Sequence, residues 1–159
     1  MKIRVGYVSN SSSSSFVVIS KNKADADTVE AHFETLKQHC DKNVFAPFSV
    51  GEKKFGWQTV KYNDFFDKLN WAFLQAFYAS EYCKKQEPLS LLDKLFAEAD
   101  LFFDWSEINE LKKSDHAYID HQSSCRDDED QLHIFTSMSA LKAFLFNKDS
   151  YIQCGNDNG

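Results

Sequence analysis

Apolar and polar positions alternate at the start of the chain and then give way to an apolar run. Residues 2–7 (KIRVGY) alternate, which is typical of a half-buried strand. Residues 16–19 (FVVI) are apolar without alternation, which predicts a central strand covered on both faces. The connection over residues 9–15 is one Asn and six Ser. Because seven residues are too few for a parallel crossover, the pattern predicts an antiparallel hairpin with a serine-rich loop.

Helical spacing of apolar residues dominates the middle of the chain. It predicts a helix near 26–40, with Asp27 and Glu30 as an N-terminal capping pair. A second helix is expected at 64–83, with Asn63 as its N-cap. This helix is apolar on nearly every side, so we expect it to form the centre of the core.

A third helix is expected after Pro88, which suits a first helical turn because its missing N–H costs nothing there. Its buried face is expected to continue to Phe102 and Phe103, and a short helix is expected at 104–111. Between the first two helices, Pro and Gly divide residues 44–60 into short extended pieces.

Short strands are expected to return near the C-terminus. The apolar segments 117–119, 132–135 and 151–154 predict them. Residues 127–130 are four consecutive acids and predict a solvated loop, while Ser137 is expected to cap a further helix.

The expected fold class is therefore α+β, with a mostly antiparallel sheet formed by N- and C-terminal strands and a central aromatic-rich helical block. We expect a single domain over residues 1–159. Its parts are an N-terminal hairpin over 1–20, a mainly helical block over 24–113, and C-terminal strands and a helix over 115–159.

The amino-acid composition excludes several classes of protein for this chain. Hydrophobic residues are 43% and charged residues 26% of the chain, as in ordinary soluble domains, and no apolar run is long enough to span a membrane. With only five Gly, the chain has neither a P-loop nor a GxGxxG motif, and no cofactor is indicated. The net charge of −6 disfavours nucleic acid and anionic membranes as partners. Nothing in the sequence indicates an oligomeric state.

The four cysteines indicate a reducing compartment. No two of them form a CxxC pair, and the basic N-terminus has no apolar signal segment. We therefore expect a cytoplasmic protein with four reduced thiols.

The serine run is the first candidate site. Hydroxyls and backbone amides of Ser11, Ser12, Ser13 and Ser14 could cradle a phosphate or a carboxylate, with Arg4 or Lys21 supplying positive charge. The alternatives are a serine nucleophile, which lacks a nearby His in the sequence, or a plain polar connection.

The second candidate is the segment that begins at Asp115 and His116 and continues to Asp120 and His121, and the last two could act as an acid–base pair. His121, Cys125 and His133 offer ligand types that zinc accepts, although their spacing matches no standard zinc module. The alternative is that these polar residues end a strand and bond to turns. We therefore expect no bound metal.

The first eighteen residues, MKIRVGYVSNSSSSSFVV, resemble a head found on many small uncharacterised proteins of tailed bacteriophages and related mobile elements. Those proteins usually have Phe where this chain has Tyr7. Residues 55–57 (FGW), 120–123 (DHQS) and 155–158 (GNDN) are similar to further segments of them. The resemblance implies expression in the host cytoplasm of an infected bacterium, and it carries no activity.

Together these observations favour a phage-type accessory protein that binds a host protein or a small anionic ligand. An acidic protein of this size can inhibit a host or defence factor by occupying its basic site. The alternatives are a hydrolase or transferase that uses Asp120 and His121 with the serine loop as anion cradle, and a minor virion component. Convergence of the two candidate sites on one concave pocket would favour the enzyme.

Overall fold

A computed structural model describes residues 2–5, 13–56, 58–107, 117–120, 124–126 and 129–156. Its main sheet has four antiparallel strands in the order β1-β2-β8-β5. These strands are β1 (Lys2–Val5), β2 (Ser13–Ser20), β5 (Val60–Tyr62) and β8 (Tyr151–Asn156). The predicted pairing of the two N-terminal strands is confirmed, and β2 is a central strand with buried Val17 and Val18 on its opposite faces. The α+β class is likewise confirmed.

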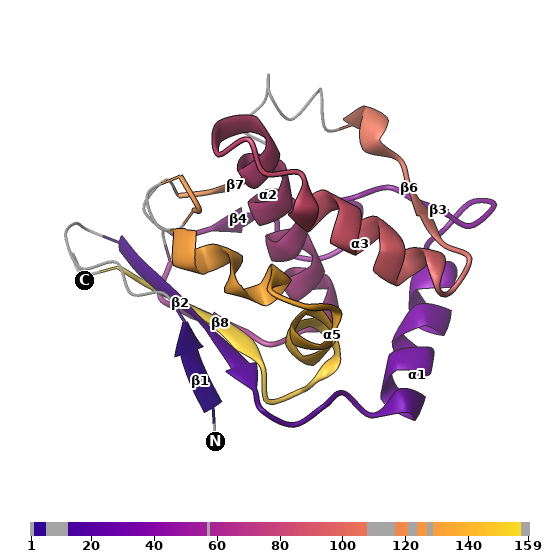
Figure 1. Cartoon of the computed structure of the whole chain (residues 1–159), viewed down its shortest axis with the longest axis horizontal. Helices are drawn as coiled ribbons and strands as arrows, with labels where there is room; N and C mark the ends of the chain where they lie inside the picture. The colour runs from indigo at the N-terminus through magenta and orange to yellow at the C-terminus, as the bar shows by residue number, and fades with distance from the viewer. Residues whose placement is uncertain are drawn as a thin grey trace.

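The described residues form four α-helices, which pack against one another, and one of them, α5, also packs against the sheet (Figure 1). They are α1 (Ala26–Lys37), α2 (Phe65–Tyr82), α3 (Glu87–Ala97) and α5 (Met138–Phe146). In Figure 1, α5 lies between the sheet and the other helices, and it contacts β2, α2 and α1. Among the described residues, no helix is both long enough and apolar enough to cross a bilayer.

Short elements connect the helices. Two small parallel pairs join β3 (Val44–Phe45) to β6 (Phe102–Phe103) and β4 (Lys54–Phe55) to β7 (Tyr118–Ile119). The described residues also form two 3-10 helices, η1 (Trp105–Glu107) and η3 (Glu129–Phe135).

The predicted central helix is confirmed. Trp71, Phe73 and Ala76 of α2 have no exposed surface, and its buried positions lie all round the helix. Its buried polar residues bind loops: Asn70 donates from Nδ2 to the Val50 carbonyl at 2.7 Å, for example. An all-round apolar helix is stable only when other elements cover every side of it, and here α3, α5, η3 and β7 pack against it.

Several local predictions are wrong in their details. Asp64, not Asn63, caps α2, because its carboxylate accepts the Phe66 N–H at 2.8 Å. Asp25, not the Asp27–Glu30 pair, caps α1 in the same way. In both cases an Asp one or two residues away from the predicted cap has the extended backbone that the capping geometry requires.

Three further local expectations also fail. Residues 132–135 form part of the 3-10 helix η3 rather than a strand, and η3 already begins at Glu129, within the acidic segment expected to be a loop. Phe102 and Phe103 leave the helical face expected for them and form β6, because the backbone of β3 supplies hydrogen-bond partners for an extended chain there.

Candidate functional site

The last residues of the serine run belong to a strand rather than to the loop expected for them. Strand β2 already begins at Ser13, and Ser13 and Ser14 pair with the last residues of β8. The β8 backbone offers ladder hydrogen bonds here, and these outweigh the preference of serine for turns. Ser11 and Ser12 lie outside the described residues. Arg4 lies in β1, so the candidate binding residues that the structure describes are distributed over two strands.

A buried polar cluster lies where the serine run meets Asp120. Ser15 and Cys154 are directly opposite residues of β2 and β8, so their side chains share one face, and both are almost fully buried. Asp120 is also buried, and its backbone N–H donates to the Phe55 carbonyl at 2.8 Å. A Cβ on Gly56 would lie 2.5 Å from the Cβ of Asp120, so these two segments are in close contact.

The side chains of this cluster have the properties of groups buried in a packed interior. Burial raises the pKa of the Cys154 thiol to about 12, the charge of Asp120 raises it as well, and a hydrogen bond from Gly56 opposes the shift. A thiol with this pKa stays protonated at neutral pH and is a poor nucleophile. The Ser15 hydroxyl has no hydrogen-bond partner among the described residues. His121 lies outside them, so the pairing of Asp120 with His121 stays a prediction.

The structure describes two of the three candidate zinc ligands, Cys125 and His133. Cys125 is buried in the turn at residues 124–126, whereas His133 is exposed on η3 with its Nε2 3.8 Å from a carboxylate oxygen of Asp130. His121 lies outside the described part of the chain. Within that part, no three His, Cys, Asp or Glu side chains are grouped so that they could hold a metal ion.

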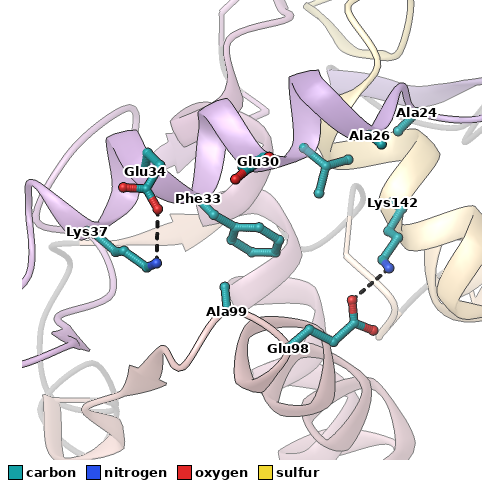
Figure 2. A pocket seen from close by; sticks show the side chains of 10 residues that line it. Ala24, Ala26, Glu30, Phe33, Glu34, Lys37, Glu98, Ala99 and Lys142 are labelled. Atoms are coloured by element: carbon teal, nitrogen blue, oxygen red, sulfur yellow. Dashed lines mark hydrogen bonds and ion pairs between the residues drawn. The ribbon is translucent and has the colours of Figure 1, made fainter.

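A groove with an apolar floor lies between α1, the turn that follows α3, and α5 (Figure 2). Its volume is about 430 Å³. In Figure 2, the Phe33 ring points from α1 into the space above Ala99. The ring makes edge-on contacts with Phe96 and Phe146, at centroid distances of 5.5 and 5.3 Å. Ala24, Ala26 and Val29 complete the apolar lining.

Charged side chains form the rim of this groove. On α1, Lys37 pairs with Glu34 at 3.0 Å, and across the groove Lys142 of α5 pairs with Glu98 at 2.7 Å. Glu30 also lines the groove, is exposed, and has no ion pair with a described residue. Because both lysines are already paired with acids, the rim has an excess negative charge at Glu30.

A second cavity of about 430 Å³ lies between the N-termini of α1 and α2 and the C-terminus of α5. Lys68 lines it with only 2% of its surface exposed. Burial lowers the pKa of Lys68 to about 8, and the nearby Asp64 charge opposes this shift. His32 also lines the cavity, and its Nδ1 lies 2.7 Å from the Thr28 carbonyl. The Lys68 ammonium donates to backbone carbonyls after α5, which assigns it a role in holding that helix end.

Neither cavity is lined by Ser15, Asp120 or Cys125. Ser15, Asp120 and Cys125 are buried, and other residues line these two open cavities. Sequence reasoning missed Glu98 and Lys142 of the groove, which are 44 residues apart. The one local signal was the helical spacing of Val29 and Phe33, which places both on the buried side of α1.

Comparisons with known proteins add no relative: no family model, no curated protein and no solved structure matches this chain.

Proposed function

We propose that this chain is a phage-type accessory protein that binds a host protein, and that the groove between α1, Glu98–Ala99 and α5 is its docking site. The ligand of this groove is a basic segment of the partner that carries a small apolar side chain. The observation that supports the proposal is the combination of an apolar floor with an acidic rim in one groove.

The charges favour a basic partner over an anionic ligand. A lysine or arginine of the partner would meet the Glu30 carboxylate, which has no competing ion pair among the described residues. A phosphate or carboxylate would be repelled by the same group. The chain as a whole has a net charge of −6, which attracts basic surfaces at long range and accelerates their association.

The floor supplies the apolar contact that such a segment needs. Phe33 is 7% exposed and lies in the groove, and Ala99 opposite it leaves room for a side chain. Three residues after Ala99, Phe102 is 57% exposed and pairs with the exposed Val44. An exposed apolar pair close in sequence to an acidic groove is a feature of protein interaction surfaces.

The phage setting rests on the N-terminal segment MKIRVGYVSNSSSSSFVV and its resemblance to phage proteins. A protein of this kind acts in the cytoplasm of the infected bacterium, where its four free thiols stay reduced. Its effect there is to occupy a basic site on a host or defence factor.

Affinity capture from a bacterial lysate tests the docking site with matched charge reversals. The bait proteins are the wild type, Glu30→Lys in the groove and Asp149→Lys outside it. Both acids are exposed, and each reversal changes the net charge equally. We expect a basic protein to be retained by the wild type and by Asp149→Lys, and to be at least tenfold depleted with Glu30→Lys.

Equal loss of the retained protein with both reversals would mean that only the net charge attracts it, and would contradict a docking groove. Equal retention with all three baits would place the docking site elsewhere. Retention of an acidic protein or of a nucleic acid would contradict the basic partner.

A further inference from the structure

Two of the four cysteines lie side by side although 42 residues separate them in the sequence. Cys83 follows the last residue of α2, and Cys125 lies in the turn at residues 124–126. Their Sγ atoms are 3.7 Å apart, and the Cys83 thiol also donates to the Cys125 carbonyl at 3.5 Å. A disulfide requires an S–S distance of about 2.05 Å, so a movement of less than about 2 Å brings the two sulfurs to bonding distance.

The turn that carries Cys125 is anchored to α2 on both sides of the sulfur. The Cys125 N–H donates to Gln75 Oε1 at 3.0 Å. The guanidinium of Arg126 stacks over the rings of Tyr78 and Tyr82, at 5.0 and 4.9 Å from their centroids. These contacts hold the sulfur close to Cys83 before any covalent bond forms.

The two thiols differ in access. Cys83 is half-buried, whereas Cys125 is 1% exposed. Burial, followed by the interaction with Cys83, raises the pKa of Cys125 to about 12. Cys83 is therefore the thiol that an oxidant in solution reaches first, and Cys125 is the neighbouring thiol that can react with oxidised Cys83.

We propose that Cys83 and Cys125 form a dithiol oxidation site, and that hydrogen peroxide converts them to a disulfide that links the 124–126 turn to the end of α2. In the first step the Cys83 thiolate attacks one peroxide oxygen and the O–O bond breaks. The hydroxide that leaves takes a proton to become water, and Cys83 becomes a sulfenic acid. In the second step Cys125 attacks that sulfur, and its proton leaves with the hydroxyl as a second water. The two cysteines lose two electrons, and the peroxide gains them.

The other two cysteines provide the internal comparison. The thiol of Cys40 donates to the Leu36 carbonyl at 3.3 Å, and Cys154 has no exposed surface. Neither has a second thiol as a hydrogen-bond partner among the contacts of the described residues. In a reducing cytoplasm such a disulfide is transient, so the site responds to an oxidative burst rather than serving as a permanent cross-link.

Oxidation of the folded, fully reduced protein by an equimolar amount of hydrogen peroxide tests the site. Free thiols are then alkylated under denaturing conditions, and peptides are analysed by mass spectrometry. We expect one disulfide, between the peptides of Cys83 and Cys125, with Cys40 and Cys154 alkylated. Dithiothreitol should restore four alkylated thiols. The same oxidation in denaturing urea should lose the preference for this pair, because the fold supplies the proximity.

Three variants separate the roles of the two sulfurs. Cys125→Ala should give no disulfide and a sulfenic acid at Cys83 that reacts with dimedone. Cys83→Ser should leave Cys125 unoxidised, and Cys40→Ser should behave as the wild type. Oxidation of Cys40 at the rate of Cys83, or a folded protein that yields no Cys83–Cys125 peptide, would overturn the proposal. Should Cys125→Ala fail to fold, the wild-type peptide map and Cys83→Ser still decide the question.

Discussion

The Lys68 ammonium on α2 donates to the backbone carbonyl of Asn147, the C-cap residue of α5, at 3.0 Å. A longer bond of 3.4 Å reaches the Ser150 carbonyl. The last carbonyls of a helix have no partner within the helix, and a cation is favourable at that end. One buried side chain thus joins the central helix to the C-terminal end of α5, which carries Lys142 of the groove.

Replacing this cation should destabilise the fold. Lys68→Met keeps the apolar stem and removes the donor, so the Asn147 and Ser150 carbonyls lose a buried partner. We expect a loss of about 1–3 kcal/mol in the free energy of unfolding, measured by urea denaturation. The exposed Lys148→Met is the matched control and should change it by less than about 0.5 kcal/mol. Equal effects of the two changes would mean that the bonds of Lys68 contribute nothing specific.

The same lysine predicts a pH dependence. Its pKa is 10.5 ordinarily and about 8 in the folded protein. Between these pH values the unfolded chain binds more protons at Lys68 than the folded chain does, so its contribution to stability rises with pH. The destabilisation caused by Lys68→Met should therefore be larger near pH 10 than near pH 7.

Other groups act in the opposite direction at high pH. Burial raises the pKa values of Tyr62 and Cys154 to about 12. As the pH rises, these groups ionise in the unfolded chain before they ionise in the folded chain, so the free energy of unfolding falls. Their contributions are common to both proteins and cancel in the difference between wild type and Lys68→Met. A difference that shrinks or stays constant from pH 7 to pH 10 would contradict the assignment to Lys68.

The aromatic core should depend on Phe73. This ring is fully buried, and its centroid lies 4.6 Å from that of Phe103 in an edge-on contact. Phe73→Ala should cost about 3–5 kcal/mol in unfolding free energy. Phe102→Ala removes an equal side chain that is 57% exposed, and it should cost less than about 1 kcal/mol. A loss below about 1 kcal/mol at Phe73 would mean that α2 is not the centre of the core.

Gly56 should resist substitution because of its backbone and its neighbour. Its φ is +116°, which L side chains rarely adopt, and a Cβ there would lie 2.5 Å from the Asp120 Cβ. Gly56→Ala should cost about 1–3 kcal/mol, measured by thermal or urea unfolding. Part of the loss should disappear in an Asp120→Gly background, where the opposing Cβ is absent. Purely additive losses would show that the contact with Asp120 contributes nothing to the cost.

The sequence predicts those elements whose pattern is long and internally consistent. The all-round apolar pattern of 64–83 has one stable outcome, a helix covered on every side, and α2 is that helix. Short apolar segments fit more than one outcome. Residues 132–135 suit a strand as well as a buried 3-10 turn, and the contacts of η3 with α2, α3 and α5 select the turn.

The sites are less predictable because distant segments build them. Ser13 and Ser14 have turn propensity locally, and only the presence of β8 beside them makes them part of a strand. Lys142 and Glu98 are 44 residues apart, and Cys83 and Cys125 are 42 apart, and no periodic pattern connects either pair. The sequence placed Cys125 in a candidate metal site, whereas the structure shows its thiol beside Cys83.

Site-specific photo-crosslinking in bacteria that express this protein tests the proposed docking groove most directly. A photoreactive amino acid is placed at Asp27, which is exposed on α1 one helical turn before Glu30, and in a second protein at Asp149. We expect a crosslink to one basic host protein from Asp27, abolished when Glu30→Lys is added, and none to that protein from Asp149. Equal crosslinking from the two positions, or a crosslink from Asp27 that survives Glu30→Lys, would contradict the account.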